Sequence, residues 1–185
     1  MLLESRSIPP EQDPDVALME QVAAGSETAF VDLVHRHQNA LLNFFTRMGA
    51  YSDGEDLVQE TFLRLFRYRE RYKPTARFTT FLYVLARNTW ADRGRKAMRR
   101  ERLTLRLQTE MEIVSETTRP EPSAGLDVQE ALGRLSPKLR EVIVLNVFQG
   151  MRYQEIADVL QIPLGTVKSR INLALHALRE VFNEQ

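Results

Sequence analysis

Residues 152–171, RYQEIADVLQIPLGTVKSRI, place two helical patterns on either side of a very short turn. Only residues 161–163 separate Leu160 from Leu164, and Ala157 is small enough to let the two helices approach. Two helices joined in this way have the geometry of a helix-turn-helix. We therefore expect the C-terminal part of the chain to carry this motif.

The second helix of the pair has a polar outward face that its own core does not use. Its outward and flanking residues are Thr166, Lys168, Ser169, Arg170, Asn172 and Leu173. The start of such a helix offers backbone N–H groups to phosphates, while Lys and Arg side chains suit phosphates or guanine edges. This pattern predicts binding in a DNA major groove; a helical hairpin with a merely solvated face is the alternative.

Apolar side chains recur at three- and four-residue spacing along the chain, which predicts an all-α protein. In the N-terminal part we expect four helices. The first runs from near Asp15 to Gly25 and the second from Ser26 to around Gly49. The third begins after an N-cap at Ser52 or Asp53, and the fourth runs from about Thr79 into RGRKAMRR. The C-terminal part predicts four more: DVQEALGRL, SPKLREVIVLNVFQG, RYQEIADVL and LGTVKSRINLALHALREVF.

The segment TEMEIVSETTRPEPSAG between these parts is rich in proline, serine, threonine and glutamate, a composition typical of a linker. The sequence therefore predicts two small helical domains, residues 15–106 and 126–185. A flexible linker, residues 107–125, joins them, and an N-terminal tail, residues 1–14, precedes them.

The charges of the 185 residues cancel, with 25 Lys and Arg against 25 Asp and Glu. Their distribution decides more than their sum. With 0 cysteines, disulfide frameworks and cysteine-ligated zinc are excluded. No segment approaches the roughly 20 apolar residues of a membrane helix, and the N-terminus does not resemble a secretory signal. We therefore expect a cytoplasmic protein without membrane insertion.

Catalytic chemistry has no candidate residues in this sequence. His35, His37 and His176 lack paired carboxylates or ligand spacing, and no nucleophile with a base or phosphate-cradling glycine loop is present. We expect no catalytic site, no metal and no cofactor, and hence not an enzyme.

A second candidate nucleic-acid surface lies on FTTFLYVLARNTWADRGRKAMRR, residues 78–100. Arg87, Asn88 and Arg95 share the face opposite its apolar residues, and further arginines continue a basic stripe. Such a stripe beside an asparagine suits phosphate tracking with a base contact. A solvated basic helix end is the alternative. Trp90 is expected to be a core aromatic.

Four segments in this order, DLVQETFLRLF, FTTFLYVLARNTWADRGRK, LSPKLREVIVLNVFQGMRYQEIADVL and IPLGTVKSRI, resemble an extracytoplasmic-function (ECF) sigma factor of bacterial RNA polymerase. The resemblance runs from about Asp15 to the C-terminus. It implies a sigma2 domain before the linker and a sigma4 domain after it. It also implies that the protein directs core polymerase to specific promoters and performs no covalent chemistry itself.

The resemblance also implies roles for individual residues. Asp56, Gln59, Glu60 and Leu63 would dock on the clamp coiled coil of the polymerase β′ subunit, and sigma4 would contact the flap of β. The loop 71–78 would capture a flipped base, and the participants would be Arg77 and the hydroxyls of Thr75, Thr79 and Thr80. Contacts to the minus-ten element would come from Arg77, Thr79, Arg87, Asn88, Arg95, Lys96 and Arg99. The upstream minus-thirty-five element would be read by Arg152, Thr166, Lys168, Ser169, Arg170, Asn172 and Leu173.

One departure and several alternatives accompany this interpretation. Relatives often offer an additional arginine where Asn172 and Leu173 stand, which leaves the upstream sequence preference open. The resemblance further implies an anti-sigma partner, which would hold the protein near the membrane. The alternatives are a helix-turn-helix regulator that does not act as sigma, and a sigma mimic that sequesters an anti-sigma factor.

Overall fold

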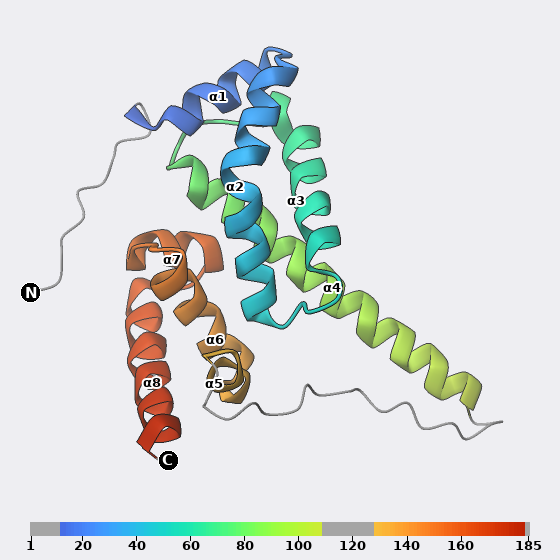
Figure 1. Cartoon of the computed structure of the whole chain (residues 1–185), viewed down its shortest axis with the longest axis vertical. Coiled ribbons are helices and arrows are strands. Elements are labelled where there is room, and N and C mark those ends of the chain that lie inside the picture. Colours follow the sequence, from blue (N-terminus) through green and yellow to red (C-terminus); the bar gives the residue numbers. More distant parts are fainter. Residues whose placement is uncertain (1–11, 109–127, 184–185) are drawn as a thin grey trace, which may run out of the picture.

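The computed structural model describes residues 12–108 and 128–183, and every regular element in these ranges is helical (Figure 1). The elements are α1 (Pro14–Ala23), α2 (Glu27–Met48), α3 (Gly54–Tyr68), η2 (Arg69–Arg71), α4 (Phe78–Gln108), α5 (Val128–Arg134), α6 (Pro137–Ile143), η3 (Val144–Phe148), α7 (Tyr153–Leu160) and α8 (Leu164–Asn183). The all-α prediction is confirmed. Most of the predicted tail and linker lies outside the described residues.

The first two helices begin and end on local signals. The Asp13 carboxylate accepts the Asp15 N–H at 3.1 Å, so α1 begins at Pro14, one residue before the predicted start. Ser26 Oγ accepts the Ala29 N–H at 3.2 Å and caps α2 as predicted. The same helix ends at Gly49, whose φ of 110° is a left-handed conformation that glycine adopts without steric cost.

Three predicted details differ in the structure. Asp53 precedes α3 but makes no capping hydrogen bond, because its carboxylate pairs with Arg93 of α4. The helix expected over SPKLREVIVLNVFQG changes after Ile143 into the π-helical turn η3, and its Ser136 side chain makes no capping bond. The helix α4 runs to Gln108, beyond the RGRKAMRR run into which it was expected to extend.

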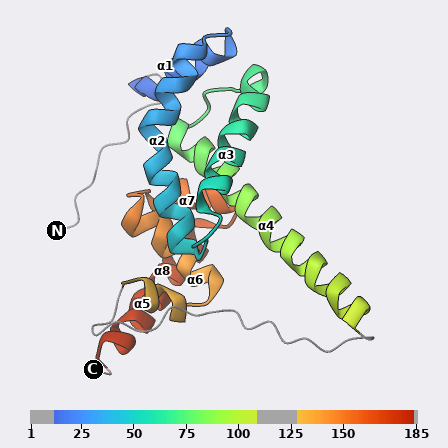
Figure 2. The same ribbon diagram turned by 45° about the vertical axis from the view of Figure 1, so that its right-hand side comes forward.

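Two groups of helices form the molecule. The N-terminal domain, α1 to α4, packs around fully buried residues such as Phe44, Phe45, Leu65, Phe78 and Leu82. The C-terminal domain, α5 to α8, encloses Leu132, Ile143, Leu145, Ile156 and Val167. The second half of α4 projects away from both domains (Figures 1 and 2), and its side chains at residues 94–100 are exposed.

The two domains pack directly against each other, and their buried residues form one continuous core. The Gln129 side chain donates to the Thr46 carbonyl at 2.7 Å, and Arg140 Nη1 donates to the Met48 carbonyl at 3.2 Å. The Arg47 guanidinium lies 4.1 Å from the centre of the Phe148 ring. These contacts place α5, α6 and η3 beside the end of α2, and α7 packs against α4.

Candidate nucleic-acid interface

The turn of the helix-turn-helix is held by Gln161, which has φ 55° and ψ 47°. Its amide donates to the Asp158 carbonyl at 2.6 Å, so a side-chain bond accompanies a backbone conformation that non-glycine residues rarely adopt. At the other end of α7, the Arg152 N–H donates to Glu155 at 2.7 Å. Both ends of α7 are therefore fixed, and this sets the direction in which α8 leaves the turn.

The outward face of α8 is where the helical pattern placed it. Lys168, Ser169, Asn172 and Leu173 are exposed, whereas Thr166 and Arg170 are half-buried. Leu173 is 61% exposed, which is high for a large apolar side chain. Val167, Ile171 and Ala174 face the core. Helical spacing groups Leu175 with Ile171, four residues earlier, and predicts that it faces the core, but it is 38% exposed.

The basic surface of α4 divides into an open part and a covered part. Asn88, Arg95, Lys96 and Arg99 are exposed. By contrast, Thr79, Arg77 and Arg87 are half-buried. The structure thus brings the predicted minus-ten residues onto one helix and the loop before it, but does not leave all of them accessible.

Acids of the C-terminal domain cover the two half-buried arginines. Arg77 Nη1 lies 3.4 Å from Glu155 Oε1, and Arg87 Nε lies 3.4 Å from Glu141 Oε1. Burial raises the pKa of the Glu141 carboxyl, while the positive charges of Arg87 and then Arg170 act in the opposite direction. Glu141 therefore lies in the field of one arginine from each predicted DNA surface.

The loop between η2 and α4 contains buried polar atoms that lack partners. Among the described residues, Tyr72 Oη and Arg77 Nε, together with Thr80 Oγ1 at the start of α4, are buried without a hydrogen bond. Burial raises the pKa of Tyr72 to about 12, with smaller contributions from Asp13 and Glu20. Buried polar atoms ordinarily find partners, so these three leave unused hydrogen-bonding capacity in and beside the loop.

The predicted polymerase-binding residues share the outer face of α3. Asp56, Gln59 and Leu63 are exposed, Leu63 by 50%. Glu60 is half-buried, because its carboxylate accepts Arg64 Nε at 2.7 Å. Beside this face, between α2 and α3, lies a groove of about 350 Å³ lined by Gln38, Asn39, Leu42, Glu55, Val58 and Gln59.

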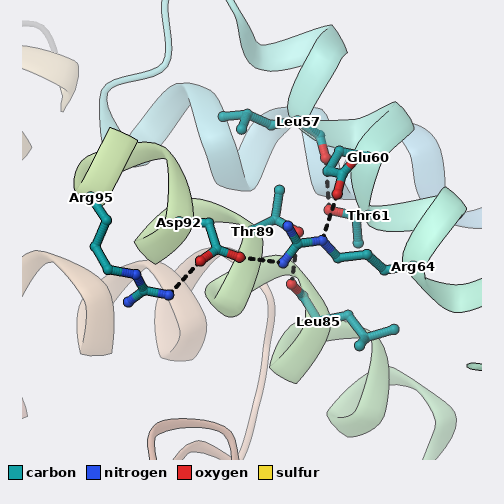
Figure 3. A network of polar contacts seen from close by, with 8 residues as sticks. All are labelled: Leu57, Glu60, Thr61, Arg64, Leu85, Thr89, Asp92 and Arg95. Carbon is teal, nitrogen blue, oxygen red and sulfur yellow. Dashed lines mark hydrogen bonds and ion pairs between the residues drawn. The ribbon is translucent and has the colours of Figure 1, made fainter. Parts of the chain in front are cut away.

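Arg64 connects the outer face of α3 with the basic surface of α4 (Figure 3). It donates to Glu60 on its own helix and, through Nη1, to Asp92 Oδ2 of α4 at 2.6 Å. Asp92 also pairs with Arg95. Hydrogen bonds from Arg64 and then from Arg95 hold the pKa of the Asp92 carboxyl below its usual range. Two of the predicted site residues, Glu60 and Arg95, thus belong to one charged network.

Several structural roles were not visible in the sequence. His37 was expected to lack a carboxylate partner, but its Nε2 lies 2.8 Å from Asp15 Oδ2 and ties α1 to α2. His176 likewise faces Glu180, 3.3 Å away. Arg140 had no predicted role, yet it donates to four backbone carbonyls. No group of His, Cys, Asp or Glu suited to a metal ion occurs in residues 12–108 and 128–183.

Comparison with known proteins identifies the family to which the chain belongs. Residues 33–100 match Sigma-70 region 2, and residues 125–178 match Sigma-70 region 4. The ECF RNA polymerase sigma-E factor of Haemophilus influenzae is 32% identical over 172 residues, covering 87% of this chain and 91% of its own. The chain belongs to the ECF sigma factors.

Another ECF sigma factor, SigW of Bacillus subtilis, is 32% identical over 174 residues, 88% of this chain and 93% of that protein. Membership in this family makes the protein an RNA polymerase sigma factor, a transcription initiation factor. The exact domain boundaries and the roles of individual residues stay predictions. None of the helices in the described ranges is long and apolar enough to cross a membrane.

Two solved structures share the fold over most of the chain. CnrH in complex with the cytosolic domain of CnrY is 30% identical, with a TM-score of 0.71 over 94% of this chain and 99% of that chain. The sigma factor RpoE of Bartonella quintana, solved with the anti-sigma factor NepR, is 25% identical, with a TM-score of 0.67 over 83% of this chain and 96% of that chain.

Proposed function

We propose that this sigma factor uses three separate surfaces to start transcription. The outer face of α3 docks on core polymerase, the loop before α4 and the basic face of α4 hold the melted minus-ten strand, and α8 enters the major groove of the upstream element. The separation of these surfaces over different elements carries the proposal. A single chain can then contact polymerase, single strand and duplex at once.

The minus-ten assignment is supported by the chemistry of the loop before α4. Tyr72 Oη, Arg77 Nε and Thr80 Oγ1 are buried without partners among the described residues, and a nucleobase edge offers the donors and acceptors that would satisfy them. The exposed side chains of Asn88, Arg95, Lys96 and Arg99 continue from there along α4. The positive charges of Arg95, Lys96 and Arg99 suit the phosphates that follow a captured base.

The upstream assignment is supported by the outward face of α8. Lys168 and Arg170 supply charge for phosphates or guanine edges, and Thr166 lies at the helix start, where backbone N–H groups face outward. Leu173 offers an apolar contact of the kind that a thymine methyl accepts. Arg152, before α7, is the residue we assign to the DNA backbone.

The test is run-off transcription with core polymerase and two matched leucine variants. Leu63→Asp places a charge on the α3 face and should weaken core association at least tenfold, because an unpaired charge at the centre of an interface is strongly unfavourable. Leu173→Asp should leave core association unchanged and abolish the footprint on duplex upstream element. Each variant is the control for the other. No promoter-specific transcript on any genomic template would refute the sigma function.

We also propose that an anti-sigma factor binds this chain in the cytoplasm. The support is that the sigma factor RpoE of Bartonella quintana, which the chain resembles in sequence and fold, was solved with the anti-sigma factor NepR. An anti-sigma factor anchored in the membrane would hold the protein near it. Co-purification from cells under inducing and non-inducing conditions tests this partner.

A further inference from the structure

A cavity of about 330 Å³ lies where α2 meets the end of η3. This volume is within the range of small-molecule sites, about 300 to 1,000 Å³. Its polar and aromatic lining consists of Arg36, Asn39, Asn43, Arg47, Phe148 and Gln149. The part of the lining that the structure describes carries two positive charges and no negative one. None of these residues is assigned to DNA or to polymerase, so the cavity is separate from the three surfaces of the proposed function.

Arg47 is a half-buried cation of this cavity that lacks an acidic partner in residues 12–108 and 128–183. Other half-buried arginines, such as Arg64 and Arg93, pair with carboxylates. The Arg47 guanidinium instead lies over the Phe148 ring, and its Nη1 is 3.5 Å from the Asn43 carbonyl, at the limit of a hydrogen bond. Its Nε is buried without any hydrogen-bond partner among the described residues. A charge partly removed from water needs a counter-ion, so an anion is the partner that this cavity lacks.

The other polar residues of the lining have hydrogen-bonding groups left for a ligand. Asn39 and Asn43 are exposed and lie four positions apart on α2, so their amides share one face of the helix. Gln149 Oε1 accepts the Tyr83 hydroxyl, which leaves the amide N–H groups of Gln149 to donate elsewhere. Arg36 gives one N–H to an aspartate of α1 at 2.7 Å, and a guanidinium has several more.

We propose that this cavity binds a small phosphate monoester, with the phosphate at Arg47 and the remainder of the ligand along Asn39 and Asn43. A guanidinium binds phosphate through two parallel N–H donors, and Nε with one Nη forms such a pair. A phosphate monoester carries about two negative charges at neutral pH, which matches the two arginines of the lining, whereas a carboxylate carries one. Sugar hydroxyls or a base edge would then meet the two asparagine amides.

The ligand would contact both domains at once, because Arg47 belongs to α2 and Phe148 to η3. A ligand that binds the folded chain and not the unfolded chain raises the melting temperature as its concentration increases. Phosphate monoesters should therefore stabilise the full chain against heat. This inference does not depend on the proposed function, because it uses none of the residues assigned to DNA or polymerase.

Two variants address the phosphate contact in different ways. Arg47→Gln removes the charge and keeps a polar side chain. Asn43→Asp places a carboxylate one helical turn before Arg47 and supplies the missing counter-ion from within the chain. An acid four positions before a basic residue stabilises a helix, so this variant should fold at least as well as the wild type. Arg67→Gln, at an exposed position of α3, is the matched control for the loss of an arginine charge.

The experiment is titration calorimetry of the full chain in a phosphate-free buffer, with AMP, ribose 5-phosphate, inorganic phosphate and adenosine as probes. We expect the two monoesters to bind the wild type with a Kd below about 1 mM. Inorganic phosphate should bind about tenfold more weakly, because it lacks the groups that meet the asparagines, and adenosine should give no heat of binding. Melting curves with AMP should show the accompanying rise in melting temperature.

Both Arg47→Gln and Asn43→Asp should weaken monoester binding at least about tenfold, as expected for the loss of a charge-assisted hydrogen bond, and Arg67→Gln should not change it. Undetectable monoester binding, or equal affinity in Asn43→Asp and wild type, would overturn the site. An equal loss in Arg67→Gln would overturn it too, since the attraction would then be non-specific. Adenosine or inorganic phosphate binding as tightly as AMP would refute a phosphate monoester as the ligand class.

Discussion

Asp13 Oδ2 accepts a hydrogen bond from the backbone N–H of Phe78 at 3.1 Å. The other oxygen of the same carboxylate accepts the Asp15 N–H, so one side chain caps α1 and also holds the start of α4. Asp13 is 8% exposed, and Phe78 is fully buried. The position of the loop that we assign to the minus-ten strand, which ends at Phe78, therefore depends on a residue 65 positions earlier in the chain.

Asp13→Ala should lower the free energy of unfolding by about 2 to 3 kcal/mol, because it removes a helix cap and leaves a buried N–H without an acceptor. Urea denaturation measures this loss. Asp13→Asn keeps one acceptor oxygen, so its free energy of unfolding should lie between those of the wild type and Asp13→Ala. Asp32→Ala, at an exposed position of α2, is the control, and an equal loss in both alanine variants would refute the role of Asp13.

Gln161→Val should destabilise the C-terminal domain by about 1 to 2 kcal/mol, because a β-branched residue fits poorly at a φ of 55°. Asn tolerates this conformation, so Gln161→Asn should stay within about 0.5 kcal/mol of the wild type. Thermal melts of both variants give the comparison. Equal melting temperatures would show that the turn relaxes to another backbone conformation.

Asp92 makes the network of Figure 3 sensitive to acid. Its pKa is lowered by Arg64 and Arg95, so its contribution to stability is present above the unfolded pKa of about 3.9 and is lost as pH falls through the lower folded value. Asp92→Asn should cost less than about 1 kcal/mol at pH 7, since the carboxylate is 34% exposed and partly screened by solvent.

The pH dependence separates this electrostatic effect from a packing effect. Urea denaturation of wild type and Asp92→Asn between about pH 7 and pH 3 should show the difference in stability shrinking in the acid range. Asp32→Asn, exposed on α2, should show no such change. A difference that stays constant with pH would mean that the carboxylate contributes through shape alone.

The sequence was sufficient for the helices and the turn, because their signals are local. The start and end of α2 are set by the adjacent residues Ser26 and Gly49. In the same way, only three residues separate the end of α7 from the start of α8. The outward face of α8 followed from helical periodicity for the same reason. Near the middle of the same helix the periodicity was wrong for Leu175, which it placed toward the core and which is 38% exposed.

The pairings of the site could not be predicted, because they join residues far apart in the chain. Arg77 and Glu155 are 78 positions apart, and Asp53 and Arg93 are 40 apart. From the sequence, several acidic residues are equally possible ion-pair partners for each arginine. Only the tertiary packing determines which of them is close enough to pair. The sequence therefore indicated which residues are polar and outward on each helix but not which of them the other domain covers.

The contacts of Arg140 could not be predicted from the sequence either. Its guanidinium donates to the carbonyls of Leu132, Gly133 and Leu135 at 2.7, 2.8 and 3.3 Å, and to that of Met48 at 3.2 Å. It therefore satisfies carbonyls at the end of α5 and reaches the N-terminal domain. Burial lowers its pKa, although an arginine remains charged at any accessible pH.

Arg140→Ala should cost about 3 kcal/mol, and Arg140→Lys about 2, because an ammonium group cannot reproduce a planar fork aimed at several carbonyls. Arg134→Lys, whose side chain is 47% exposed, should stay within about 0.5 kcal/mol of the wild type. Urea denaturation monitored at the single tryptophan, Trp90, follows the N-terminal domain, and circular dichroism follows both. If Arg140→Lys is as stable as the wild type, charge alone suffices and the fork has no structural role.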